Sequence, residues 1–140
     1  MNRPLYTNEV LRLAASLREP QSLDEEHGRA ELRSPTCGSR IVTIVQLDSD
    51  RRIVGLSQQV HACAFGQASA ALLEQYAFGR SHTEATQALL GLSRWLAAET
   101  DESGDWPGLD ALSPARTRKS RHGAILLPFR ALLAAIESAR

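Results

Sequence analysis

The sequence lacks the features that mark several common protein classes. It has two cysteines in 140 residues, 16 Lys and Arg balanced by 16 Asp and Glu, and no apolar run near the roughly 18–20 residues that cross a bilayer. The balanced charge gives no net field that would draw the chain to nucleic acid or to an anionic membrane. We therefore expect neither among its partners.

The first residues, MNRPLYTNEV, contain no apolar core of a signal peptide. Together with the few cysteines, this favours a cytoplasmic protein in a reducing compartment, where a structural disulfide between Cys37 and Cys63 is not expected. The length suits one ordinary domain, and 43% hydrophobic residues are enough for a core. The sequence thus predicts a single domain over residues 1–140.

Hydrophobic periodicity predicts one helix followed by three strands. Apolar residues three and four apart indicate a helix at about residues 6–18, which Pro20 terminates. The segments RAELR, RIVTIVQLD and RIVGLSQQVHA are strand-like, and the last two are joined by the turn DSDRR. Strands with such short connections pair antiparallel, so we expect a meander. Four residues of the third strand are expected to face the core: Val54, Leu56, Val60 and Ala62.

The second half of the chain returns to helical periodicity. A stripe beginning at Phe65 predicts a helix that Gly79 terminates. Ser81 and Glu84 form a capping box for the next helix, and Pro128 lies in the first turn of the last helix or kinks it. Strands followed by helices indicate an α+β fold. We expect a three-stranded antiparallel meander with an N-terminal helix and a helical second half, and with the helices packed on one face of the sheet.

Two loop features leave alternatives open. Trp106, in the polar loop TDESGDWPG, either covers an edge of the core or anchors a partner protein. The basic run Arg116, Arg118, Lys119 and Arg121 either grips phosphate or forms a solvated loop or a docking surface for an acidic partner. Because this run has no interleaved aromatic residues, a solvated loop or a docking surface for an acidic partner is favoured over nucleic-acid binding.

The two cysteines occupy positions that suit thiol chemistry. Cys37 lies in the turn SPTCGSR before the second strand, and Cys63 lies where the third strand gives way to a helix. The dipole and free N–H groups of a helix N-terminus favour the thiolate, which is both the nucleophile and the metal ligand. Antiparallel pairing of the two strands brings both thiols to one edge of the sheet. The alternative is two unrelated buried cysteines.

These windows resemble the NifU/IscU/SufU-type iron–sulfur cluster assembly scaffold family. The family carries a first cysteine in a turn as A-x-C-G-D and a second at a strand-to-helix junction as G-C-x-x-x-x-A-S; SPTCGSR and HACAFGQASAALL match these windows. SPARTRKSRHGAILLPF resembles the third window, in which a histidine precedes a third cysteine. The resemblance covers the chain from Leu5 onward. It implies a SufE/NifU-like fold, with Cys37, Cys63 and His122 as metal ligands.

The chain departs from the family pattern in three places. Ser39 stands where the family has aspartate, Gly123 stands where it has the third cysteine, and LSPAR replaces the chaperone-binding L-P-P-V-K. A [2Fe–2S] cluster or a zinc ion takes about four ligands, mostly thiolate and imidazole. Ser39 is a poor fourth ligand because a hydroxyl stays protonated near neutral pH. We therefore expect weaker metal binding than at a complete site.

The resemblance implies a non-enzymatic scaffold that binds iron, a transient [2Fe–2S] cluster or zinc. It would accept sulfur from a cysteine desulfurase and pass clusters to apo-protein acceptors. A second hypothesis keeps the fold but makes the protein a zinc-binding or metal-free partner of the desulfurase. A third is a thiol-dependent hydrolase in which His61 serves as the base for Cys63.

Overall fold

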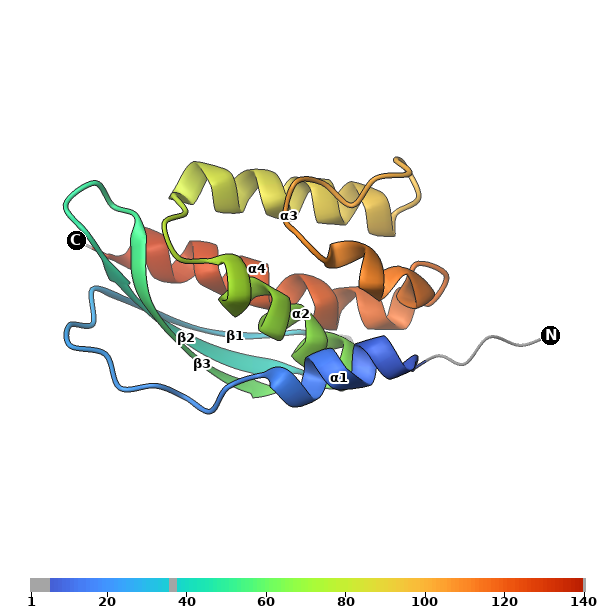
Figure 1. Cartoon of the computed structure of the whole chain (residues 1–140), viewed down its shortest axis with the longest axis horizontal. Helices are drawn as coiled ribbons and strands as arrows, with labels where there is room; N and C mark the ends of the chain where they lie inside the picture. Colours follow the sequence, from blue (N-terminus) through green and yellow to red (C-terminus); the bar gives the residue numbers. More distant parts are fainter. Residues whose placement is uncertain (1–5, 36–37, 140) are drawn as a thin grey trace.

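The computed structural model describes residues 6–35 and 38–139. Thr36 and Cys37 therefore lie outside the described residues. Four α-helices, three strands and two short 3₁₀ helices follow one another along the described chain (Figure 1). In chain order they are α1 (Asn8–Ser16), β1 (Gly28–Arg33), β2 (Arg40–Leu47), β3 (Ile53–His61), α2 (Ala64–Tyr76), α3 (His82–Leu96), η1 (Leu109–Ala115), η2 (Lys119–Arg121) and α4 (His122–Ser138).

Side-chain hydrogen bonds cap the N-termini of α1 and α3. Thr7 Oγ1 accepts a 3.1 Å hydrogen bond from the Val10 amide, and Ser81 Oγ accepts one of 3.2 Å from the Glu84 amide. Each bond satisfies an amide that has no partner within its own helix. The predicted start of the helix at Ser81 is confirmed. Gly79, with a φ of +85°, occupies the left-handed turn between α2 and α3, close to the predicted stop.

The three strands form one antiparallel sheet in the order β1-β2-β3. Arg40 of β2 lies opposite Arg33 of β1 on one side and opposite His61 of β3 on the other. The inner face of the sheet carries Ile41, which is fully buried against Leu127 of α4. The α+β meander with helices on one face is therefore confirmed.

A β-bulge changes the phase of β3 near its start. Leu47 pairs with Ile53 while Gln46 pairs with Gly55, so Val54 is the additional residue in β3. Ile53 is fully buried and Val54 is 45% exposed. The prediction that Val54 faces the core is wrong, because strict alternation does not allow for an extra residue. Leu56, beyond the bulge, is buried as expected.

The helices form layers over the inner face of the sheet. α4 packs on β1 and β2, α3 packs on α4, and α1 packs on α2 (Figure 1). Gly28 permits the close approach of β1 to α4, because a Cβ at this position would collide with the carbonyl oxygen of Ala135. Within the described residues, the helices are too short or too polar to cross a membrane.

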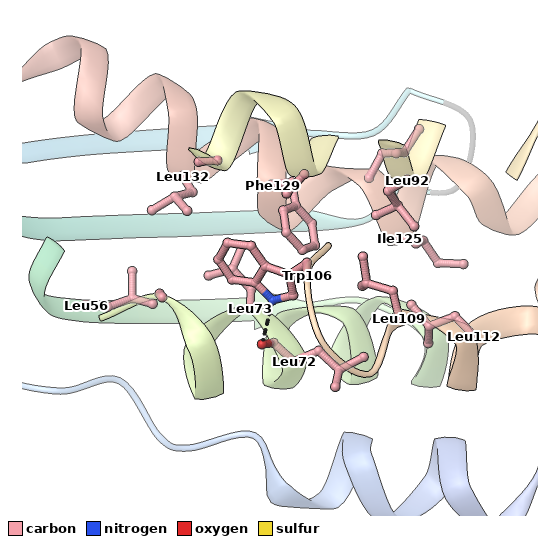
Figure 2. Close-up of a cluster of buried hydrophobic side chains, with 14 of the residues drawn as sticks. Leu56, Leu72, Leu73, Leu92, Trp106, Leu109, Leu112, Ile125, Phe129 and Leu132 are labelled. Atoms are coloured by element: carbon pink, nitrogen blue, oxygen red, sulfur yellow. Dashed lines mark hydrogen bonds between the residues drawn. The ribbon is translucent and has the colours of Figure 1, made fainter. Parts of the chain in front are cut away.

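Trp106 lies inside the core, between α2 and α4. Its side chain is 2% exposed, and its indole Nε1 donates a 3.0 Å hydrogen bond to the Leu72 carbonyl. The ring meets Phe129 edge-on at 5.2 Å between centroids. Trp106 is thus a core residue and presents no ring surface for anchoring a partner. Figure 2 shows it among buried residues of the sheet and helices: Leu56, Leu72, Leu73, Leu92, Leu109, Leu112, Ile125, Phe129 and Leu132.

Pro128 lies within α4, beyond its first turn. The alternative that placed it in the first turn is wrong, because α4 begins at His122. Proline has no N–H, so the carbonyl of Ala124, four residues earlier, lacks its usual helical donor. That carbonyl faces Gly66 of α2. The proline therefore falls where α4 and α2 come close together.

Candidate functional site: two helix N-termini at one end of the sheet

Helices α2 and α4 run parallel. Gly66 lies against Ala124, Ser69 Oγ donates to the Ile125 carbonyl at 2.6 Å, and Trp106 bridges the Leu72 carbonyl to the ring of Phe129. Positions along α2 and α4 therefore increase together. Because the helices are parallel, their N-termini lie at the same end of the molecule, which is also the end where β3 finishes (Figure 1).

Cys63 is the N-cap residue of α2. Its backbone is extended, with φ −67° and ψ 173°, and its carbonyl accepts a 2.9 Å hydrogen bond from the Gln67 amide. No side chain caps the helix, so the first amides of α2 keep their hydrogen-bonding capacity beside the thiol. The thiol is free and half-buried. These amides and the helix dipole favour an anionic group here, as the sequence predicts.

Gly66 holds the two N-termini close together. A Cβ at this position would lie 2.6 Å from the Cβ of Ala62 and 3.2 Å from the carbonyl oxygen of Ala124. The first distance is shorter than any normal carbon–carbon contact, so a larger residue would force α2 away from its neighbours. The packing of the first turn of α2 against Ala62 and against Ala124 of α4 therefore requires glycine.

His122 is the first residue of α4. Its Nε2 lies 2.8 Å from the carbonyl oxygen of Ala115 in η1. A carbonyl can only accept, so Nε2 carries a proton and Nδ1 is the ring nitrogen left for a metal. A histidine held by a backbone carbonyl through one nitrogen and free at the other is a common arrangement for a metal ligand. Cys63 and His122 are thus each the residue at which one of two adjacent, parallel helices starts.

The turn between β1 and β2 lies at the same end of the sheet. The Ser34 amide donates to the Ser39 carbonyl at 2.8 Å, and the Gly38 amide donates to the Ser34 carbonyl at 3.1 Å. Gly38 has a φ of +71°, in the left-handed region that glycine tolerates best. Ser39 is buried. Cys37 lies outside the described residues, but the strand pairing on which its predicted proximity to Cys63 depends is confirmed.

His61 does not contact Cys63 through any hydrogen bond that the described part of the chain contains. By the register of β3, it lies on the outer face of the sheet, directly opposite Arg40, and it is exposed. It also lines a groove of about 350 Å³ beside α1, together with Gln67 and Glu19. Among the described residues, no hydrogen bond or ion pair orients the ring of His61 as a Cys/His hydrolase pair requires.

Arg116 has a structural role that sequence analysis missed. Its guanidinium lies 5.1 Å from the ring of Trp95, and it donates 2.9 Å hydrogen bonds to the carbonyls of Trp95 and Thr100. It therefore fastens the end of η1 to the end of α3 and is not free to bind phosphate. Arg118 and Lys119 remain exposed in the same basic run.

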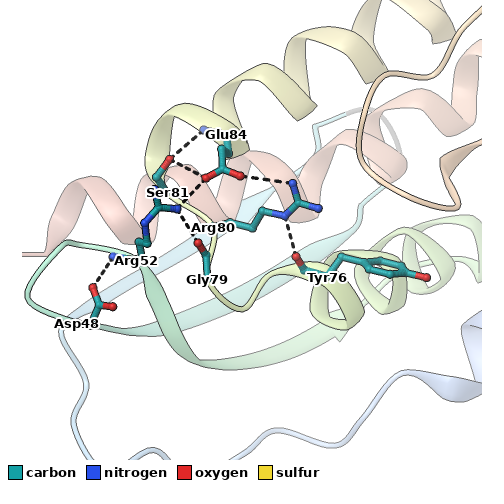
Figure 3. A network of polar contacts seen from close by, with 7 residues as sticks. All are labelled: Asp48, Arg52, Tyr76, Gly79, Arg80, Ser81 and Glu84. Atoms are coloured by element: carbon teal, nitrogen blue, oxygen red, sulfur yellow. Dashed lines mark hydrogen bonds and ion pairs between the residues drawn. The ribbon is translucent and has the colours of Figure 1, made fainter.

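The perturbed carboxyl groups lie away from this end. Arg52 and Arg80 both reach Glu84, at 2.9 and 3.5 Å (Figure 3). The hydrogen bond from Arg52 is the main reason why the pKa of Glu84 falls below its ordinary value. Burial raises the pKa of Glu74, near the C-terminal end of α2. Neither carboxyl belongs with the residues around Cys63.

The metal ligands predicted from sequence, Cys37, Cys63 and His122, stay a prediction. Within residues 6–35 and 38–139, no three His, Cys, Asp or Glu side chains are grouped closely enough to hold a metal ion. Cys63 and His122 supply two donors at most from this part of the chain. A third protein ligand would have to come from Cys37, as the family resemblance implies.

Comparison with known proteins rests on structure. No family model matches the sequence, and no curated protein matches it significantly. The crystal structure of a nitrogen-fixing NifU-like protein (N-terminal) from Brucella abortus has a TM-score of 0.82, with 27% identity over 96% of this chain and 93% of that one.

Two further solved structures share the fold at lower identity. A putative iron–sulfur cluster assembly scaffold protein for the SUF system from Fervidobacterium islandicum has a TM-score of 0.83 and 18% identity over 94% of this chain and 96% of its own. A hypothetical protein solved at 2.3 Å has a TM-score of 0.69 and 22% identity, covering 92% and 96%. This chain therefore shares the fold of the NifU-like and SufU-type structures over nearly its whole length.

Proposed function

We propose that this protein is an iron–sulfur cluster assembly scaffold that accepts sulfur at Cys63 from a cysteine desulfurase. The observation that carries the proposal is the convergence of two parallel helix N-termini on Cys63 and His122. The free amides at the start of α2 and the dipoles of the two helices favour anions at this place, and thiolates, persulfides and sulfide-bridged iron are all anionic. The structural similarity to scaffold proteins supports the same function.

Cys63 takes up sulfur by attacking the terminal sulfur of the persulfide carried by the desulfurase. The Cys63 thiolate forms a new S–S bond, the old S–S bond breaks, and the desulfurase thiolate leaves with the electron pair. The half-buried position at the start of α2 keeps the thiol reachable by a docked protein. The persulfide formed on Cys63 is the sulfur source for a cluster.

The cluster is cargo, held by Cys37, Cys63 and His122. His122 would bind through Nδ1 because Nε2 is engaged with Ala115. A [2Fe–2S] cluster takes four ligands, so three protein donors leave one position for a thiol of the delivering or receiving protein. A site of this kind releases its cargo readily to apo-protein acceptors.

A second function has one observation in its favour. Gly123 occupies the position of the family's third cysteine. The protein would then accept persulfide sulfur, or bind zinc, without assembling a cluster. Sulfur transfer to Cys63 is common to both functions, and cluster formation separates them.

The test is anaerobic reconstitution with ferrous iron, a cysteine desulfurase and L-cysteine, followed by measurement of iron and acid-labile sulfide. We expect visible absorbance that Cys63→Ala and Cys37→Ala abolish and that His82→Ala, at an exposed position of α3, preserves. A persulfide on Cys63 with no bound iron or sulfide would favour the second function. A wild-type protein that gains neither sulfur nor iron would refute both.

A further inference from the structure

Three basic residues form one row across the outer face of the sheet. Arg33, Arg40 and His61 are direct neighbours in the register of β1, β2 and β3. Directly paired residues point to the same face, and the adjacent inner row packs against α4, so this row faces away from the helices. Arg33 and His61 are exposed, and Arg40 is half-buried.

The row is unfavourable for folding. Two arginines directly opposite each other repel. The strand residues of this face provide one acidic neighbour, Glu31, whose carboxylate lies 3.9 Å from Arg33 in a well-exposed pair. Among the described residues, Arg40 and His61 have no ion-pair partner. A cost in stability at such a place indicates a function outside the folded chain.

The row lies beside the thiol. His61 precedes Cys63 by two residues, which is about 7 Å of extended chain. A protein seated on the row would therefore reach Cys63 without any rearrangement of the sheet. The helices cover the inner face of the sheet (Figure 1). The loop between α1 and β1 packs on the outer face around Ser57 and Gly55, away from the basic row, whose Arg33 and His61 stay exposed.

We propose that Arg33, Arg40 and His61 are the docking row for an acidic surface of the protein that supplies sulfur to Cys63. This inference rests on the function proposed above. Guanidinium groups bind carboxylates with two parallel hydrogen bonds, so paired arginines match a carboxylate-rich surface. The row spans two strand spacings, about 10 Å. That width fits a few carboxylates and is narrow for a nucleic acid, and the chain has no net charge.

The test compares wild-type protein, an Arg33→Gln/Arg40→Gln double variant and an Arg29→Gln control. Arg29 lies on the same face of the same strand, two rows from the basic row. The assay measures the rate of persulfide formation on Cys63 by mass spectrometry, with a cysteine desulfurase from the same organism and L-cysteine, at low and high salt. Urea unfolding of each variant is measured in parallel.

We expect the double variant to transfer sulfur about tenfold more slowly at low salt and to lose most of the salt dependence, because surface charges act mainly on association. Its stability should equal or exceed that of wild type, and Arg29→Gln should resemble wild type. Equal rates and salt dependence in the double variant would overturn the docking row and leave the proposed function standing. No persulfide on wild-type Cys63 would overturn both. Binding of a fluorescent oligonucleotide that the double variant loses, with transfer unchanged, would assign the row to nucleic acid.

Discussion

Ser69 on α2 donates a 2.6 Å hydrogen bond to the main-chain carbonyl of Ile125 on α4, with both residues fully buried. This bond joins the two helices whose N-termini carry Cys63 and His122. It lies one helical turn beyond the contact of Gly66 with Ala124. The position of the thiol relative to the imidazole therefore depends on a few contacts in the first turns of α2 and α4.

Replacing Ser69 with alanine should destabilise the protein by about 1–2 kcal/mol, because a buried carbonyl loses a donor. Urea unfolding measures the change. Thr86→Ala is the control, since its Oγ1 donates a 2.9 Å bond to the carbonyl of His82 at an exposed position, where water replaces the lost donor. Equal losses in the free energy of unfolding of the two variants would show that the buried Ser69 bond stabilises the protein no more than the exposed Thr86 bond.

Gly66→Ala should destabilise the protein by about 1–3 kcal/mol, because the added methyl group overlaps Ala62 and overpacks the contact with Ala124 of α4. Gly91→Ala is the matched control in α3. A Cβ there would meet Gly104 at an ordinary 3.4 Å, and alanine favours a helix over glycine by about 1 kcal/mol. The two substitutions should thus change the free energy of unfolding in opposite directions. A stabilising Gly66→Ala would contradict the close approach of the helices.

The pattern of the strands predicted the sheet well, and its failures have local causes. Short turns determine antiparallel pairing, which is why the start of β2 lies beside the end of β3 as expected; the register places Arg40 opposite His61. The bulge at Val54 has no signal in an alternating apolar run, so the burial of this residue was predicted wrongly. Trp106 sits in a polar loop, and only the tertiary structure shows that the loop folds its ring into the core.

The candidate site was predicted in part. Chain order placed Cys63 at the start of a helix, and the structure confirms this. The parallel packing of α2 and α4 depends on contacts between segments far apart in sequence, such as Ser69 with Ile125, which periodicity does not reveal. The hydrogen bond that fixes the ring of His122 is likewise tertiary, because Ala115 belongs to η1.

Glu84 should make stability fall in acid. Its pKa lies below the ordinary value of 4.5 because Arg52 hydrogen-bonds to its carboxylate. The stabilisation is therefore complete above pH 4.5 and is lost as pH falls through the lower pKa of the folded state. The pair is exposed, so its contribution should stay below about 1 kcal/mol. Between pH 6 and pH 3, the free energy of unfolding of Glu84→Gln should fall less than that of wild type.

Glu74 should give a pH dependence of stability opposite in sign to that of Glu84. Burial raises its pKa, so its contribution to stability is greatest at low pH and declines as pH rises through the folded-state value. Glu74→Gln keeps an acceptor for the Arg18 amide and removes the buried charge. This variant should therefore gain stability relative to wild type as pH rises from 4 to 7. A loss over that range would mean that the charge itself is needed by its neighbours.

His122 can be tested as a ligand separately from its structural bond to Ala115. His122→Ala removes both functions, whereas glutamine retains an N–H donor for the carbonyl but is a poor metal ligand. We expect both variants to bind zinc at least about tenfold more weakly than wild type, as loss of a ligand or its partner does, and His61→Ala to bind normally. Glutamine should recover the stability that alanine loses. If glutamine also restores zinc affinity, His122 only positions η1 against α4, and the metal is held by the thiols alone.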